Sequence, residues 1–149
     1  MIAEKYDFIS LEDEDYFEFV SVGPKGEITK VVQFILIDFE RSIYNLGLGD
    51  KNTLTNEIID NVASNNKDTD KIFATIGEIG RQFLERKPDA AVLFEGNSKS
   101  RNRLYRMGIS KYINDISKNY IIFGLKEQNL EWKRFKESSD YIAFIISKI

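Results

Sequence analysis

The chain contains no cysteine and no histidine among its 149 residues. Without cysteine there is no disulfide framework, no thiolate nucleophile and no cysteine-ligated metal. Without histidine the chain lacks the side chain that most often transfers protons near neutral pH, and also the commonest zinc ligand. Catalysis would have to use carboxylates, lysine, arginine, tyrosine, serine or a hard cation held by carboxylates. We therefore expect neither a metal centre nor a cofactor.

Long hydrophobic runs are also missing. The longest apolar-rich segment, VVQFILIDF, is interrupted by Gln33 and Asp38 and is far shorter than the roughly 18 to 20 residues that cross a bilayer. The first residues, MIAEKYDF, lack the basic segment followed by an apolar one that marks a secretion signal. These absences predict a cytoplasmic protein that does not enter a membrane.

The chain does contain enough apolar material for one core. Apolar residues make up 42% of it, including eleven Phe and seven Tyr, and its length favours a single domain over residues 1–149. The net charge of −3 argues against a broadly basic nucleic-acid binder. Charge is unevenly spread, because residues 1–20 are mostly acidic whereas residues 99–136 carry ten bases against three acids. The two ends of the chain are thus oppositely charged.

The first third of the chain predicts β-structure. Residues 16–22 and 28–39 are rich in β-branched and aromatic side chains and flank GPKG, which suits a tight turn. With further strands at residues 6–10 and 41–50, they predict an antiparallel meander of four strands. The polar residues 49–66 predict a long connection that contains one helical turn at residues 56–60.

The remainder predicts two helices among shorter strands. Apolar residues recur at spacings of four, three and four over residues 68–87, and again from Ser98 or Ser100 to Ile116. Strands are expected at residues 90–95, 120–125 and 141–149, with a turn or short helix at residues 130–135. The fold class is therefore α+β: a mostly antiparallel sheet, made of the four-strand meander and three later strands, with two main helices on one face.

The segment GNSKSRNRLYRM, residues 96–107, carries four positive charges and no negative one. A strand, a glycine and a serine-rich helix start suit anions, because free backbone N–H groups and the positive end of the helix dipole meet there. The candidate anion-binding residues are Gly96, Asn97, Ser98, Arg101, Arg103 and Arg106. The candidate catalytic residues are Glu95, Arg101 and Tyr105.

A structural interpretation of the same segment stays open. A serine at the helix start can cap the helix, and the arginines can form a solvated face or pair with the acidic amino-terminal residues. Arg101 lies at the margin of the buried face, where we expect internal hydrogen bonds to hold it.

Two further clusters have alternative interpretations. Oxygen-bearing side chains that could hold a hard cation are Asp50, Asp60, Asn65, Asn66, Asp68 and Asp70. Those next to the first helix are also where helix caps and first-turn acids belong, and we favour capping. Trp132, Phe135 and Tyr141 are expected in the core, the alternative being an exposed stacking platform.

Four stretches together resemble a family of small proteins, mostly from Bacteroidota, that is known as a domain of unknown function. They are GPKGEITKVVQF, YNLGLGD, SNNKDTDKIFATI and VLFEGNSKSRNRLYRMGI, and the resemblance covers nearly the whole chain. The family pattern around Gly96 resembles F-x-G-S-x-x-x-R-x-R-L-Y-R, whereas this chain has Asn97 in place of the usual Ser and Ser98 one position later. The resemblance implies one α+β domain and a bacterial cytoplasm, and it brings no activity.

Two functional hypotheses follow. The first is a protein that contacts phosphate or nucleic acid, such as the effector of a toxin–antitoxin or defence pair, through Arg101, Arg103, Tyr105 and Arg106. The second is a non-catalytic module that binds a small protein partner or itself as a homo-oligomer. The opposite charges of the two ends and a free strand edge would favour such association.

Overall fold

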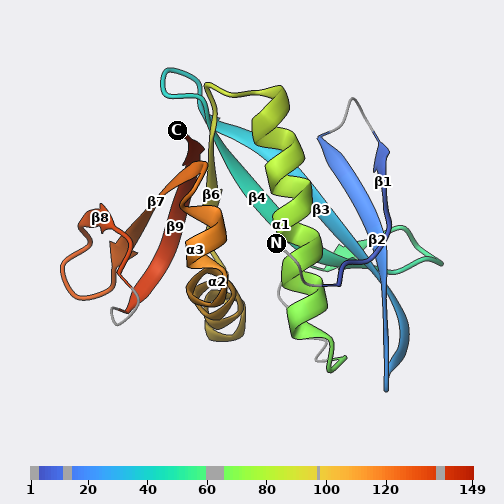
Figure 1. The fold of residues 1–149 in the computed structure, drawn as a ribbon. Coiled ribbons are helices and arrows are strands. Elements are labelled where there is room, and N and C mark those ends of the chain that lie inside the picture. The colour runs from blue at the N-terminus through green and yellow to red at the C-terminus, as the bar shows by residue number, and fades with distance from the viewer. Residues whose placement is uncertain (1–3, 12–14, 60–65, 97, 137–139) are drawn as a thin grey trace.

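The computed structural model describes residues 4–11, 15–59, 66–96, 98–136 and 140–149. They form an α+β fold in which helices pack against one large sheet (Figure 1). The first strands are β1 Phe8–Leu11, β2 Tyr16–Gly23, β3 Gly26–Asp38, β4 Ile43–Lys51 and β5 Ile58–Ile59. After them come α1 Thr69–Arg86, β6 Ala91–Phe94, α2 Lys99–Lys111, α3 Ile113–Ile116, β7 Tyr120–Lys126, β8 Trp132–Arg134 and β9 Tyr141–Lys148. Among the helices of these residues, none combines the length and the apolar composition that a bilayer crossing requires.

The strands are ordered β1-β2-β3-β4-β6-β9-β7-β8 across the sheet, and the short β5 pairs with β4 outside this order. β1 to β4 form the predicted antiparallel meander, with a tight turn between Gly23 and Gly26. β6 runs parallel to β4 and antiparallel to β9. A parallel pair needs a crossover connection, and α1 lies in the connection between β4 and β6. β6 therefore joins the meander to the three carboxy-terminal strands.

The three helices of the described residues lie on the same face of the sheet (Figure 1). The apolar stripe predicted over residues 68–87 is buried, and Phe83 of α1 stacks on Phe34 of β3 with ring centroids 4.0 Å apart. On α2, Tyr105 packs edge-on against Phe94 of β6 at 5.4 Å. These contacts confirm the predicted α+β packing, and they place the core between the helices and this face.

The opposite side of the sheet, which we call the helix-free face, has an apolar surface of its own. Strand residues alternate between the two faces, so the neighbours of the buried Phe17, Phe19 and Phe34 point away from the helices. Exposed apolar side chains on β1, β2 and β3 of this face are Ile9, Leu11, Val20, Val22 and Ile35, which keep 38% to 58% of their surface accessible. The amino-terminal half of the sheet thus presents apolar side chains to solvent on this side.

The polar connection at residues 49–66 is shorter than predicted. β4 continues through Lys51, and β5 pairs with its last two residues where we expected a helical turn. The backbone N–H of Asn52 donates to the carbonyl of Glu57 at 2.8 Å and closes the intervening loop. The prediction of a helical turn was wrong because one isolated turn is costly to nucleate, whereas an existing strand edge offers ready partners. Residues 60–65 lie outside the described part of the chain.

The carboxy-terminal aromatic residues divide between core and surface. The turn or short helix predicted at residues 130–135 contains β8, which pairs with the edge of β7. Tyr141 is buried and Phe135 stacks on it at 5.4 Å, so the expected core position is confirmed for Tyr141. It was wrong for Trp132, which is 42% exposed because it lies on the short edge strand.

Candidate functional site

The turn that enters α2 is closed by hydrogen bonds within the chain. The Oγ of Ser98 accepts a hydrogen bond from the backbone N–H of Arg101 at 3.2 Å, so Ser98 caps the helix as the structural interpretation predicts. The N–H of Gly96 donates to Oδ1 of Asn102 at 2.8 Å. A Cβ atom at Gly96 would lie 2.5 Å from the Cβ of Arg101. The space that glycine leaves here is therefore taken by the first turn of α2, and Asn97 lies outside the described residues.

The three candidate arginines make contacts in different places. Arg101 is only 8% exposed, and its Nη1 donates to the backbone carbonyl of Leu48 in β4, which confirms that internal hydrogen bonds hold it. Arg103 is exposed, and its Nε lies 3.4 Å from the sulfur of Met107. Arg106 forms an ion pair with Asp140 at 3.3 Å. The guanidinium groups do not surround one hollow in the structure.

The two remaining catalytic candidates lie in contrasting environments. Tyr105 is 1% exposed, and burial raises the pKa of its hydroxyl to about 12, with the charge of Arg101 acting weakly in the other direction. Glu95 follows β6 and is exposed. A phenol this deep in the core remains protonated near neutral pH and packs against Phe94. The arrangement gives Tyr105 a packing role.

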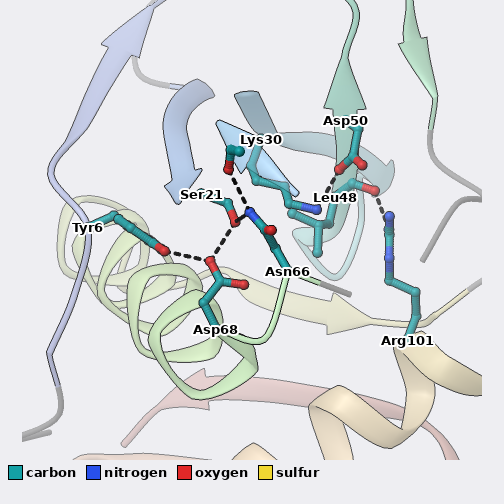
Figure 2. Close-up of polar contacts among 9 residues, drawn as sticks. Tyr6, Ser21, Lys30, Leu48, Asp50, Asn66, Asp68 and Arg101 are labelled. Atoms are coloured by element: carbon teal, nitrogen blue, oxygen red, sulfur yellow. Dashed lines mark hydrogen bonds and ion pairs between the residues drawn. The ribbon is translucent and has the colours of Figure 1, made fainter. Parts of the chain in front are cut away.

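A polar cluster that sequence reasoning assigned to helix capping instead joins α1 to the sheet (Figure 2). Asp68 occupies the N-cap position of α1, but its side chain caps no backbone N–H. Its Oδ2 accepts hydrogen bonds from the hydroxyls of Tyr6 and Ser21, both at 2.5 Å. The pKa of Tyr6 is raised, first by burial and then by the hydrogen bond to Asp68. The capping prediction is thus wrong for this carboxylate, because the hydroxyls of the buried Ser21 and the half-buried Tyr6 both donate to it.

Asn66 performs a similar joining role and is 2% exposed. Its Nδ2 donates to the Oγ of Ser21 at 3.1 Å and to the carbonyl of Gly26 at 3.0 Å, while its Oδ1 accepts from the N–H of Lys25 at 2.7 Å (Figure 2). The amide therefore holds the β2–β3 turn against the segment that enters α1. A helix-capping role for Asn66 was a wrong prediction, because the turn offers the buried amide both donors and acceptors.

Beside this cluster, a lysine is buried on the helix-covered face of the sheet. Lys30 of β3 is 4% exposed, and its Nζ lies 2.6 Å from Oδ1 of Asp50 in β4 (Figure 2). The two residues are directly paired across the strands. Sequence reasoning missed the pair, although Lys30 shares the inward alternation of Val32 and Phe34. Two residues along β4, Leu48 supplies the carbonyl that Arg101 of α2 binds, so neighbouring positions of β4 hold two cations, Lys30 and Arg101.

The carboxylates considered for a hard cation are committed elsewhere. Asp50 pairs with Lys30, Asp68 accepts from two hydroxyls, and Asp70 pairs with Lys111 at 3.0 Å. Within the residues that the structure describes, no group of three carboxylates is placed to hold a metal ion. Asp60 and Asn65 lie outside those residues.

Comparison with known proteins adds a family and no activity. The family model described as "Family of unknown function (DUF6934)" matches residues 3–149. No curated protein and no solved structure matches the chain.

Proposed function

Because the chain belongs to the family of unknown function DUF6934, membership supplies no activity, and we propose from geometry that the protein is a non-catalytic module that associates with itself. The partner is a second copy of the chain, and the contact is the helix-free face of the sheet. The observation that carries this proposal is the group of exposed apolar side chains on that face, while all helices cover the other.

The charges on this face favour a second copy as the occupant. Glu18 of β2 and Lys51 of β4 lie on it and pair with each other at 2.8 Å, and Tyr16 donates a second hydrogen bond to Glu18 at 2.8 Å. The pair leaves this part of the face electrically balanced. In a two-fold symmetric contact each surface meets its own copy, so a net charge would repel itself. Because Glu18 and Lys51 cancel each other, the self-repulsion of this face is limited to Glu27, which lies opposite Val22 beside the β2–β3 turn.

The geometry of a sheet also suits such a contact. Two sheets can pack face to face at about 10 Å, with their apolar side chains interdigitating between them. In this arrangement Val20 and Ile35 of one copy would lie between side chains of the other. This contact does not require the opposite charges at the two ends of the chain. One of the cations concerned, Arg106, already pairs with Asp140 of its own chain.

Light scattering coupled to size exclusion tests the proposal. Wild-type protein at tens of micromolar should elute with twice the mass of the chain, and Val20→Lys and Ile35→Lys should each shift it to the single-chain mass. Leu54→Lys is the control, because Leu54 is 93% exposed in the loop between β4 and β5, outside the strands β1 to β3 that carry these side chains. A monomeric wild type, or a dimer that survives both lysines, contradicts the proposal.

A second candidate keeps the phosphate or nucleic-acid hypothesis for the exposed cations of α2. The first turn of this helix contains no acid, and Lys99 and Arg103 are both exposed on it. These two side chains could contact a nucleic-acid backbone in the cytoplasm, including as a toxin–antitoxin or defence effector. Fluorescence anisotropy with single-stranded RNA should then show binding that weakens as salt rises. The double variant Lys99→Gln with Arg103→Gln should abolish this binding. Binding at low salt that neither salt nor these substitutions change contradicts it.

A further inference from the structure

A cavity of about 170 Å³ lies between α1 and the α2–α3 segment, above β6 and β9. Figure 1 shows the two helical elements side by side on the sheet at this point. The apolar residues that line the cavity are Phe73, Gly77, Gly80, Leu84, Val92, Phe94, Ile109, Ile116 and Ile146. Since most of these side chains are less than a tenth exposed, the inner wall of the cavity is apolar.

Two glycines of α1, Gly77 and Gly80, line this cavity. Phe73, Gly77, Gly80 and Leu84 follow one another at spacings of four, three and four, and therefore lie on one stripe of the helix. A glycine inside a helix costs about 0.5 to 1 kcal/mol relative to alanine. At Gly80 packing does not require a glycine, because an added Cβ would meet nothing closer than the ring of Phe94 at 3.8 Å.

Gly108 of α2 shows the opposite case. A Cβ there would collide with the ring of Phe73, so packing alone accounts for this glycine. No such collision accounts for Gly80. The residue keeps open a volume that one methyl group would begin to fill.

The rim of the cavity is polar and electrically balanced. It consists of Lys5, Glu78, Arg81, Asp115, Asn119 and Tyr120. Arg81 donates three hydrogen bonds to Glu78, from Nε to Oε1 at 2.7 Å and to Oε2 at 3.2 Å, and from Nη2 to Oε2 at 2.8 Å. These bonds lower the pKa of Glu78. The hydroxyl of Tyr120 donates to Glu85 at 3.0 Å. Two bases and two acids therefore surround the opening, and an ionised ligand gains no net attraction from them.

We propose that this cavity binds a small uncharged molecule built on one aromatic or alicyclic ring, with a single hydrogen-bonding group that faces the polar rim. The volume supports this ligand class, since a cavity of about 150 Å³ with similar apolar walls accommodates benzene. The site lies on the helix-covered side of the sheet. It is therefore independent of self-association through the helix-free face.

Methyl NMR with p-cresol as the probe tests the proposal on the full chain. Isoleucine methyl groups should shift saturably at Ile109, Ile116 and Ile146, with a dissociation constant below about 1 mM. Those of Ile9 and Ile35, on the helix-free face, should not move. Benzoate, the charged probe of similar size, should bind at least about tenfold more weakly because its carboxylate must be desolvated.

Gly80→Ala separates binding from folding. The added methyl group should raise the thermal midpoint by about 1 to 4 °C while it weakens p-cresol binding about fourfold. Gln82→Ala, on the exposed side of the same helix, is the matched control and should leave the affinity unchanged.

Three outcomes would overturn the proposal: shifts that do not saturate, shifts centred on the helix-free face, or equal affinity for p-cresol in wild type and Gly80→Ala. Titration of the Ile35→Lys variant distinguishes the two proposals. The cavity should bind p-cresol in that variant whether or not wild-type protein is a dimer.

Discussion

The ammonium group of Lys30 lies 2.6 Å from the carboxylate of Asp50, and the two residues face each other across β3 and β4 beneath the helices. Their side chains are 5% and 17% exposed. Taking two charges out of water is costly unless each keeps its partner, so this contact constrains both strands.

Removing one partner of this pair should be strongly destabilising. Asp50→Asn removes the negative charge that the buried ammonium of Lys30 contacts at 2.6 Å, and we expect a loss of about 3 to 5 kcal/mol in the free energy of unfolding. Urea denaturation measures it. The double variant Lys30→Met with Asp50→Leu should recover part of this loss, because both charges are then absent. A double variant less stable than Asp50→Asn would contradict this account.

Arg101 and Arg103 should respond differently to the same substitution. Arg101→Met removes the charged donor to the carbonyl of Leu48 and should cost about 2 kcal/mol of unfolding free energy. Arg103→Met is the matched control, and an exposed site of this kind should change stability by less than about 0.5 kcal/mol. Both values come from urea denaturation, and equal losses would refute the structural assignment of Arg101.

Alanine at Gly96 should strain the entry into α2. Its Cβ would lie 2.5 Å from the Cβ of Arg101, and such overpacking costs about 1 to 3 kcal/mol. Gly47→Ala in β4 is the control, because a Cβ there meets nothing closer than 3.8 Å. Thermal unfolding of the two variants should show a lower midpoint for Gly96→Ala alone.

Glu18 should make the protein sensitive to acid. Burial pushes its pKa upward, but the hydrogen bonds from Lys51 and Tyr16 outweigh burial and lower the pKa below its ordinary value. A carboxylate with a lowered pKa stabilises the folded state above the unfolded pKa of about 4.3, and that contribution is lost as the pH falls through the folded pKa. The free energy of unfolding of wild type should therefore exceed that of Glu18→Gln by about 1 kcal/mol near pH 7, and this difference should disappear below about pH 4.

Lys51→Met provides the matched measurement for Glu18. It removes the cation that lowers the pKa of Glu18, so the stability of this variant should change less between about pH 7 and pH 3 than that of wild type. Equal pH dependence in the two proteins would show that the Lys51 contact does not stabilise the carboxylate.

The elements predicted correctly are those whose signals are local. Pro24 and Gly26 mark the hairpin turn, the alternation on both sides marks β2 and β3, and a helical period marks α1. β5 and β8 were missed because strands of two and three residues carry too little pattern and depend on a distant partner strand. Local sequence thus determines the large elements, and tertiary pairing determines the small ones.

The polar contacts follow the same division. The inward position of Arg101 and the cap at Ser98 could be read from helix geometry, because both depend on residues within one turn. The role of Asn66 could not, since its partners Lys25 and Gly26 lie 41 and 40 residues away in the sequence. The cavity was missed for the same reason: its glycine stripe is visible in the sequence, but its other walls are not.

The position of β6 between β4 and β9 has a consequence for synthesis on the ribosome. The strand that completes its hydrogen bonding, β9, follows all the other described strands in the sequence, so one edge of β6 stays open until β9 emerges. Until then β7 and β8 have no neighbour that links them to the meander. Translation must therefore pass β9 before this sheet can close, and a nascent chain stalled before β9 would expose an unpaired, aggregation-prone edge of β6.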